Sequence, residues 1–483
     1  MSKKNSIQIN AILNVIKQCC VIIFPLVTFS YTSRVLGADN LGRFSFSDSV
    51  ISYLYVLASL GIPTYAVREV SRIRNQKKQL EKMTNELFSI NIVMTIITML
   101  LLIILVDFIP RLSQERVLII ILSTTIICNT FGRDWINTVF EDFSFLTLIY
   151  IITQVISLVL ILTMVKSRSD LIVYTIIMAF SRSFYYLLNL FHTKKYVPYR
   201  LTLHFNLTQH FKPILYLFCI SIATTIYVKS DIIILGFFRS NSEVGIYSLA
   251  TNVYLVIKSL LNAIITVAIP RLSLFLGENN KKMYMKLLNG LRISLYTLMI
   301  PSVIGAWFLS KDILMVLGGR AFIYGFVSLR ILCIALLFTV FGCFYSQAVL
   351  VPNRDERSYF FATMISALIN IGLNFIFIPL FGINGAALTT VIAELTVVII
   401  CKKRSSNYLF NFSKINFLPI CIGCGLIGMI CILMQLYVQS LAIRIMGSVG
   451  LSVFVYAIIL LLGKNPLALE AVQFINNKIS LKK

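Results

Sequence analysis

Nine charged residues lie within segments that are otherwise apolar, and their types suggest what chemistry this chain could carry out. The six basic residues are Lys17, Arg182, Lys229, Lys258, Arg292 and Arg330, and the three acidic residues are Asp48, Asp231 and Glu394. A charge in hydrocarbon is costly and usually faces a cavity or a charged partner. The excess of basic groups therefore predicts an interior cavity that binds an anionic substrate.

The basic residues differ in their expected depth. Arg182 and Lys258 lie near the midplane of their segments, too deep to reach either membrane interface easily. Lys229 and Arg330 lie towards the outside, and Arg34 ends the first apolar segment. We expect these five residues to form a cationic cavity. Snorkelling to the interface or internal ion pairing is the alternative, and it would account for roughly half of the charged positions.

The three carboxylates have two possible roles. Asp48, Asp231 and Glu394 could couple transport to a cation by binding it or by taking up a proton, but a structural ion pair would look the same in the sequence. Lys229 and Asp231 are two positions apart on one expected helix, so their side chains point in different directions. We therefore expect any partner of either residue to lie on another helix.

Two apparent motifs lose their usual meaning in their context. The glycines Gly423, Gly425 and Gly428 have the spacing of a dinucleotide fingerprint, but they lie inside an apolar segment rather than after a strand. Close helix packing explains them better. Cys421 and Cys424 share this segment and have no second ligand pair, so we expect no zinc site.

The remaining chemical groups predict no catalysis. The three histidines, His192, His204 and His210, fall in or beside one loop, where we expect them to be solvated rather than bound to a metal. The chain has no phosphate-binding loop, so we expect no ATP hydrolysis. We predict that the protein is not an enzyme and has no cofactor. Aromatic residues such as Tyr185, Tyr186 and Trp307 could line a sugar-accepting cavity, although bilayer-facing rings are common.

The composition shows which elements must position these groups. Of 483 residues, 58% are hydrophobic and only 13% are charged, whereas soluble chains have about 45–50% apolar and 25% charged residues. Most of the chain must therefore lie in lipid. The net charge of +24 would suggest a nucleic-acid partner in a soluble protein, but in a membrane protein it is typical of basic cytoplasmic loops. We expect no nucleic-acid binding.

Fourteen apolar runs between residues 11 and 462 are each long enough to span a bilayer, which takes roughly 20 residues. With the N-terminus inside, the assigned cytoplasmic loops hold the excess of Lys and Arg, for example around Arg72 and Lys78. We therefore predict a multi-pass protein of the cytoplasmic membrane with both termini in the cytoplasm. The longest loops hold about 20 residues, too few for an extramembrane domain.

An internal repeat divides the predicted helices. The stretch at 33–49 resembles the stretch at 232–252, with Gly42 opposite Gly245. Each is the expected outer turn between the first two helices of a six-helix unit, where glycine permits a tight turn and close packing. We predict an N-terminal lobe at 1–200 with helices 1 to 6, and a C-terminal lobe at 201–404 with helices 7 to 12. Helices 13 and 14 and a cytoplasmic tail follow at 405–483.

Three stretches carry a family resemblance: NAILNVIKQCCVIIFPLVTFSYTSRVLGADNLGRFSFSDSV near the N-terminus, GIPTYAVRE after the second helix and LFGINGAALTTVIAE at 380–394. They resemble bacterial polysaccharide-repeat-unit flippases of the Wzx type, in the superfamily that includes the lipid II flippases and the MATE exporters. The resemblance covers essentially the whole chain. It implies an all-α, V-shaped membrane transporter with two six-helix lobes and two appended helices.

The resemblance also implies a substrate and a mechanism. The expected substrate is an undecaprenyl-pyrophosphate-linked oligosaccharide, moved by alternating access from the inner to the outer leaflet of the bacterial cytoplasmic membrane. The product would enter O-antigen, capsule or exopolysaccharide synthesis. Relatives bind the pyrophosphate with cavity arginines, a role that carries over to Arg34 within the first matching stretch. Membrane lipids are further expected partners, as are the polymerase and the chain-length machinery of the same pathway.

Two other functions remain open at the level of the sequence. A cation-coupled multidrug or metabolite exporter of the same fold would be expected to keep an anionic cavity, which the six basic residues disfavour. A membrane polymerase or glycosyltransferase would be expected to carry a large external loop or an acidic sugar-nucleotide motif. The chain has neither feature.

Overall fold

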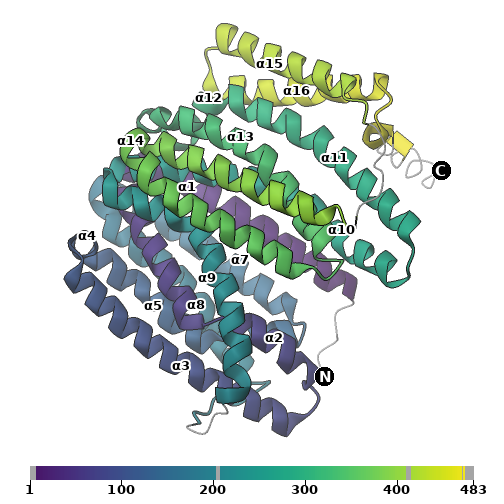
Figure 1. Ribbon diagram of the computed structural model, residues 1–483. Helices are drawn as coiled ribbons and strands as arrows, with labels where there is room; N and C mark the ends of the chain where they lie inside the picture. The colour runs from purple at the N-terminus through teal and green to yellow at the C-terminus, as the bar shows by residue number, and fades with distance from the viewer. Residues whose placement is uncertain (1–6, 203–206, 409–414, 470–471, 474–483) are drawn as a thin grey trace, which may run out of the picture. The chain divides into compact units, whose positions relative to one another are not determined.

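The computed structural model describes residues 7–202, 207–408, 415–469 and 472–473, and within these ranges it contains helices and no strands (Figure 1). The contacts divide the chain into two compact units, Met1–Gly245 and Ile246–Lys483. Each unit is described by itself below. The predicted lobes at 1–200 and 201–404 stay a prediction, because these units group contacts rather than repeats.

The first unit is built from long helices joined by short turns. Its elements are α1 (Ile7–Ser59), α2 (Ile62–Arg72), α3 (Lys77–Phe108), α4 (Pro110–Gln114), α5 (Arg116–Gly132), α6 (Trp135–Val139), α7 (Phe143–Met164), the 3-10 turn η1 (Arg168–Asp170), α8 (Leu171–Thr193), α9 (Leu207–Phe238) and the start of α10 (Asn241–Gly277).

The second unit continues along α10. Its further elements are α11 (Lys281–Phe308), α12 (Ser310–Gly318), the 3-10 turn η2 (Arg320–Gly325), α13 (Phe326–Cys343), the π-helical segment η3 (Phe344–Leu350), α14 (Glu356–Ser405), α15 (Leu418–Tyr437) and α16 (Leu441–Leu462).

Twelve helices of the described chain are long and apolar enough to cross a membrane. Two of them, α1 with 53 residues and α14 with 50, would be about 75–80 Å long if straight, whereas the hydrocarbon core is about 30 Å thick. Each contains one non-helical glycine, Gly37 in α1 and Gly382 in α14. Counting the halves of α1 and α14 separately gives fourteen spans, which confirms the predicted number.

The two halves of α14 fold back on each other at Gly382. Ser366 donates a hydrogen bond to the carbonyl of Ala393 across the hairpin, and Thr389 donates one to Asn374. The φ of +58° at Gly382 is in the left-handed region, which a glycine adopts without steric cost. The reversal therefore depends on the missing Cβ at this one position.

Large apolar side chains cover the outer faces of the helices. In α3, Ile96, Leu100, Ile103 and Ile104 are each more than half exposed. A soluble protein rarely exposes such a stripe, because contact of apolar surface with water is unfavourable. Lipid is the solvent that suits this surface, in agreement with the predicted membrane location.

The short helix α2 is amphipathic and packs against its neighbours through one face. Ile62, Tyr65, Ala66 and Val70 are buried along that face, in a cluster with residues of α3, α6 and α9. Gly61, with a φ of +71°, precedes α2 and lets the chain leave α1 at a sharp angle. This arrangement covers one end of the helices that line the cavity described below.

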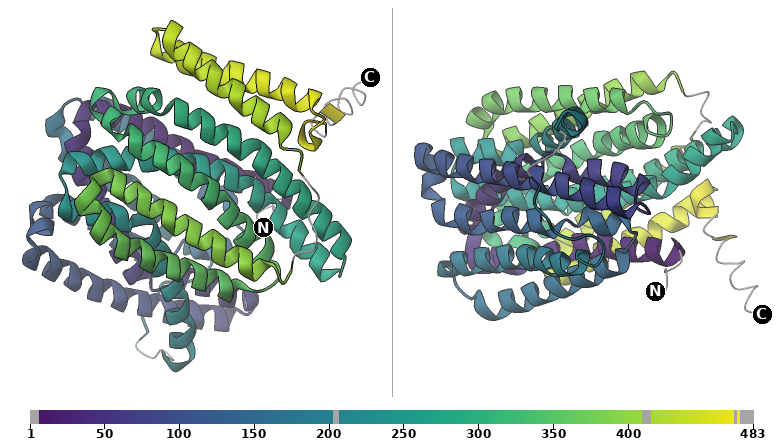
Figure 2. Two further views of the ribbon diagram at one scale, coloured as in Figure 1. Left: turned by 45° about the horizontal axis from the view of Figure 1, so that its top comes forward. Right: turned by 90° about the horizontal axis from the view of Figure 1, so that it is seen from below.

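Helices α15 and α16 pack against each other and against α11 (Figures 1 and 2). Tyr456 of α16 donates a hydrogen bond to the carbonyl of Thr297 in α11, with a distance of 2.8 Å. Arg444 of α16 forms an ion pair with the buried Asp312 of α12. The appended pair is thus attached at two levels to the rest of its unit.

The glycine motif of α15 serves this packing. A Cβ on Gly423 would lie 2.4 Å from the ring of Tyr456, and one on Gly428 would lie 3.0 Å from the ring of Phe308. Gly425 faces open space. The interpretation as helix packing is confirmed at two of the three glycines.

We expect Gly423→Ala to lower the free energy of unfolding by about 1–3 kcal/mol, because its methyl group overlaps the Tyr456 ring. Thermal melts of the detergent-solubilised protein measure this change. Gly425→Ala is the matched control in the same helix, and we expect it to be neutral or slightly stabilising, because alanine favours helix. Equal melting temperatures for the two variants would contradict the packing role of Gly423.

Candidate functional site

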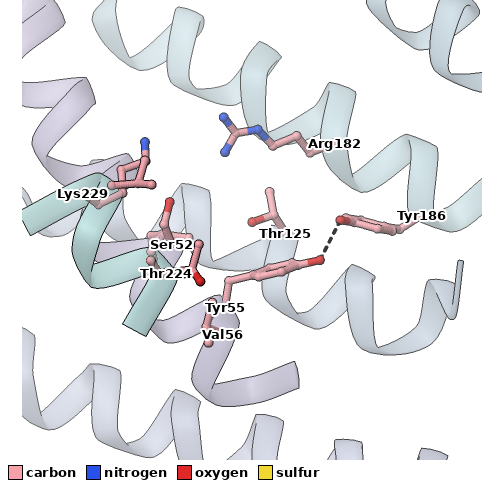
Figure 3. Close-up of a pocket in the computed structure, with 11 residues that line it drawn as sticks. Ser52, Tyr55, Val56, Thr125, Arg182, Tyr186, Thr224 and Lys229 are labelled. Atoms are coloured by element: carbon pink, nitrogen blue, oxygen red, sulfur yellow. Dashed lines mark hydrogen bonds between the residues drawn. The ribbon is translucent and has the colours of Figure 1, made fainter. Parts of the chain in front are cut away.

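The first unit contains a cavity of about 450 Å³ between four helices (Figure 3). It is lined by Ile51, Ser52, Tyr55 and Val56 of α1, Thr125 of α5, Arg182 and Tyr186 of α8, and Thr224, Thr225, Val228 and Lys229 of α9. Two basic groups and a set of hydroxyl groups thus share one wall system. The cavity is a binding site for a polar, anionic group, as the residue types predict.

The two basic groups of the cavity share one carboxylate. Arg182 Nη1 lies 2.5 Å from Asp48 Oδ1, and Lys229 Nζ lies 3.5 Å from Asp48 Oδ2. Asp48 is on α1, so the pairing joins α1, α8 and α9. Lys229 therefore finds its partner on another helix, as expected. Two cations facing one anion leave an excess of one positive charge beside the cavity.

The exposed fractions of these side chains show which group a ligand can reach. The side chain of Asp48 is only 14% exposed, whereas those of Arg182 and Lys229 are 39% and 30% exposed. A guanidinium has five N–H donors, so Arg182 can bind Asp48 through Nη1 and present further donors to a ligand. The cations face the cavity and the carboxylate supports them from behind.

Hydroxyl groups form the adjoining part of the cavity. The hydroxyl of Tyr55 donates a hydrogen bond to Asn129 Oδ1 at 3.0 Å and lies 3.2 Å from the hydroxyl of Tyr186 (Figure 3). Thr224 and Thr225 lie on α9 across the cavity. Of the predicted aromatic candidates, Tyr186 lines this cavity, and Tyr185 packs edge-on against it. This wall has both the ring faces and the hydroxyl groups that bind sugars.

A regular spacing on α1 could have indicated this wall. Asp48, Ser52, Tyr55 and Ser59 recur at intervals of three or four residues within an apolar segment. Such a spacing places polar groups on one face of a helix. The sequence analysis considered only charged and large aromatic groups on α8, so it did not identify Ser52 or Tyr55.

In the second unit, Lys258 and Glu394 form a separate ion pair. Lys258 Nζ of α10 lies 3.3 Å from Glu394 Oε1 of α14, and the hydroxyl of Tyr254 donates to the same oxygen at 2.8 Å. The hydroxyl of Thr339 lies 2.7 Å from that of Tyr254. The Glu394 side chain is 5% exposed, so this carboxylate is enclosed by its partners.

The other predicted site residues lie apart from these two clusters. Arg330 donates to the carbonyl of Trp307 at 3.2 Å and to Ser310 Oγ at 3.1 Å, and its guanidinium lies over two aromatic rings. It joins the end of α11 to α13. Arg34 is exposed, three residues before the kink of α1, and Asp231 is buried on α9. The side chain of Lys17 lies outside the described part of the chain.

The expectation that the histidines are solvated is wrong for His210 and for His192. His210 is 2% exposed, with Nδ1 2.8 Å from the Tyr65 hydroxyl and Nε2 3.0 Å from Glu86 Oε2. His192 stacks on Phe145. The loop after α8 folds back onto the ends of neighbouring helices, which a loop assignment from sequence cannot show. His204 lies outside the described residues.

His192 belongs to a cluster around Asp142, in the turn between α6 and α7. His192 Nε2 and the Tyr196 hydroxyl each lie 2.8 Å from Asp142 Oδ2, and Lys195 Nζ lies 3.0 Å from it. The described residues contain no group of three or more His, Cys, Asp or Glu that could hold a metal ion. The cluster is therefore a polar joint between α7 and the loop after α8.

Comparison with known proteins gives a consistent picture. Residues 8–276 match the family described as polysaccharide biosynthesis protein. A protein of Escherichia coli (strain K12) named as an O-antigen transporter is 23% identical over 405 residues, which cover 82% of this chain and 96% of that protein. A protein of Haloferax volcanii named as a low-salt glycan biosynthesis flippase is 27% identical over 201 residues, or 41% of each chain.

Solved structures share the fold at low sequence identity. The lipid II flippase MurJ, in an inward closed conformation, has a TM-score of 0.78 at 16% identity, over 95% of this chain and 99% of that chain. An inward-facing MATE family multidrug resistance transporter of the MOP superfamily has a TM-score of 0.61 at 14% identity, over 81% and 98%. These similarities confirm the predicted all-α, MATE-like transporter fold.

The Asp142 cluster predicts a pH-dependent stability. Burial by itself would raise the pKa of Asp142, but the hydrogen bonds from His192, Tyr196 and Lys195 outweigh it and lower this pKa from 3.8 to about 2. The ionised carboxylate thus stabilises the folded state fully above pH 4, and this contribution is lost as the pH falls from about 4 to about 2.

We expect Asp142→Asn to lower the free energy of unfolding by about 1–3 kcal/mol at pH 7, because three donors lose a charged acceptor. Thermal melts at pH 7 and at stepwise lower pH measure the difference from the unsubstituted protein. The difference should shrink below pH 4. A difference that stays constant down to pH 2 would contradict the role of the ionised carboxylate.

Proposed function

Because the chain belongs to the polysaccharide biosynthesis protein family, we propose that it is a flippase for lipid-linked oligosaccharides. The substrate is an undecaprenyl-pyrophosphate-linked repeat unit, which moves from the cytoplasmic to the outer leaflet of the bacterial cytoplasmic membrane. The observation that carries this proposal is the cavity where Arg182 and Lys229 face one buried carboxylate. The O-antigen transporter and glycan flippase named above support the same class of substrate.

A pyrophosphate needs such a site in order to cross the membrane. It carries about two negative charges, whose transfer into hydrocarbon without replacement of the hydration shell would cost far more than a protein's total stability. Arg182 supplies a planar set of donors that grips two phosphate oxygens at once, and Lys229 supplies a compact positive charge. The hydroxyl-rich wall with Tyr55 and Tyr186 is placed for the first sugar.

Asp48 has a defined part in this mechanism. Without substrate, its carboxylate neutralises much of the charge of Arg182 and Lys229 and keeps both side chains in place. When the pyrophosphate enters, its oxygens replace Asp48 as the partner of these cations. Asp48 then competes with the substrate, which makes binding reversible and permits release on the far side.

The remaining predicted residues take secondary roles in this proposal. Arg34, Lys258 and Arg330 add positive charge along the path of the pyrophosphate, and Asp231 and Glu394 are the candidates for coupling to an ion. The two six-helix lobes, at 1–200 and 201–404, alternate between inward-open and outward-open V shapes. Both termini face the cytoplasm, and no catalytic step is required. The polymerase and chain-length machinery receive the product.

We expect Arg182→Ala to lower the rate of flipping by at least roughly 30-fold, because a lost buried charge contact costs about 2 kcal/mol or more. The assay uses proteoliposomes with a fluorescent undecaprenyl-pyrophosphate oligosaccharide and a membrane-impermeant quencher. Arg182→Lys should keep part of the activity. Arg116→Ala is the control, because Arg116 is exposed and pairs with an exposed aspartate. Normal flipping by Arg182→Ala, at equal protein amount, would remove this residue from the site.

Asp48→Asn tests the competition directly. With the neutral amide, Arg182 and Lys229 lose their internal anion, so we expect a soluble short-chain prenyl pyrophosphate to bind about tenfold more tightly, which corresponds to about 1.4 kcal/mol. We also expect slower flipping, because release becomes harder. Titration calorimetry in detergent measures the affinity. Weaker binding by Asp48→Asn would show that the carboxylate orients the cations rather than competing for them.

A further inference from the structure

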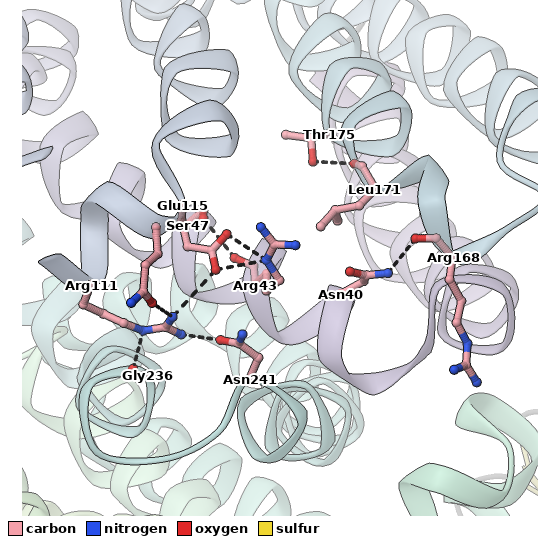
Figure 4. A network of polar contacts seen from close by, with 11 residues as sticks. Asn40, Arg43, Ser47, Arg111, Glu115, Arg168, Leu171, Thr175, Gly236 and Asn241 are labelled. Carbon is pink, nitrogen blue, oxygen red and sulfur yellow. Dashed lines mark hydrogen bonds and ion pairs between the residues drawn. The ribbon is translucent and has the colours of Figure 1, made fainter.

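A second polar network, separate from the cavity, fastens the turn between α9 and α10 to the rest of the first unit (Figure 4). Arg111 of α4 donates through Nε to the carbonyl of Gly236 at 2.6 Å, and its Nη2 bonds the side-chain oxygen of Asn241. Gly236 and Asn241 lie on either side of the turn. One arginine therefore holds both ends of this turn.

A buried carboxylate anchors that arginine. Glu115 is 2% exposed, and both of its carboxylate oxygens lie 3.0 Å from Arg43 Nε. Arg111 Nη1 lies 3.7 Å from Glu115 Oε1. Glu115 thus pairs with one arginine that touches the turn and with another, Arg43 of α1, that does not touch it in these contacts.

The backbone of the turn also lies very close to α1. A Cβ on Gly42 would lie 1.7 Å from the carbonyl oxygen of Asn241, and one on Gly245 would lie 2.0 Å from the carbonyl oxygen of Ala38. These two glycines are the equivalent positions of the internal repeat. Their lack of side chains allows the close contact that the polar network then fastens.

The position of the turn in the chain suggests why it is fastened in this way. By sequence, residues 232–252 belong to the second repeat, yet the contacts place the chain up to Gly245 in the first compact unit. The helix α10 continues from this turn to Gly277, within the second unit. The docked turn is therefore the part of the second repeat that the network holds against the first.

We propose that Arg43, Arg111 and Glu115 form a latch that closes the outer end of the substrate path, and that this latch must open for release into the outer leaflet. The inference rests on the proposed function and its orientation, which place this turn on the outer side. It names the residues that control access to the cavity containing Arg182.

The chemistry of the network suits a contact that breaks and forms repeatedly. Arg111 and Arg43 are 17% and 35% exposed, so water can take over the hydrogen bonds that Arg111 loses. Exchange of protein partners for water changes the free energy only modestly. When Arg111 leaves, Glu115 stays paired with Arg43, and no buried charge is stranded. Two arginines around one carboxylate meet this requirement, whereas a single pair would not.

The test measures access to the cavity from outside. The ten native cysteines are replaced, Ser52→Cys is introduced in the cavity wall, and cells are treated with a membrane-impermeant maleimide. We expect Arg111→Ala to raise the labelling rate roughly tenfold, because loss of a charged partner shifts the equilibrium between closed and open states. Gly42→Ala should act in the same direction by steric pressure. Arg116→Ala, in the next helix, should leave the rate unchanged.

An unchanged labelling rate in Arg111→Ala would overturn the latch, provided that the purified variant melts at the temperature of its parent. If Arg111→Ala does not fold, Asn241→Ala removes one contact and leaves the Arg111–Glu115 pair, and the same two outcomes apply to it. The labelling needs no lipid-linked sugar. Faster labelling together with no flipping by the unsubstituted protein would uphold the latch and overturn only the proposed substrate.

Discussion

The rest of the structure depends on one constraint, which is that an ionised group in hydrocarbon must have a partner. Asp48 meets it by sharing its carboxylate between Arg182 of α8 and Lys229 of α9, so three helices are held around one charge. Removal of any member would leave an uncompensated charge, which is strongly destabilising. The same constraint makes the site suitable for an anion, because a pyrophosphate can satisfy the two cations as well as the carboxylate does.

The two units meet this constraint with opposite arrangements of charge. In the first, the acidic residue Asp48 lies on the second predicted helix and the basic residue Arg182 on the sixth. In the second, the basic residue Lys258 lies on the second helix of its repeat and the acidic residue Glu394 on the sixth. Arg182 lies eleven residues after the start of α8, and Glu394 lies eleven residues after Ile383, the first residue beyond the kink of α14. Equivalent positions thus carry opposite charges, and only the first pair lies at the cavity described above.

Glycines set the geometry in which these charges meet. Gly37 and Gly382 interrupt helices that would otherwise be too long for a bilayer, and Gly42 and Gly245 let two backbones approach within contact distance. Each acts through the absence of a Cβ, because a side chain would either strain the backbone or collide with a neighbour. Polar contacts such as Arg111 to the carbonyl of Gly236 then act on surfaces that these glycines have brought together.

The membrane class, the number of spans and the excess of positive charge follow from composition and hydropathy alone, because each depends on transfer of individual segments into lipid. The sequence also identified Arg182, Lys229 and Asp48 as important, because charges inside apolar segments are visible without a structure. Only the tertiary structure decided which charges meet: Lys258 pairs with Glu394 and not with Asp48, and His210 is buried rather than solvated. Partners 134 or more residues apart, as for Arg182 and Asp48, are set by helix packing, which no local pattern encodes.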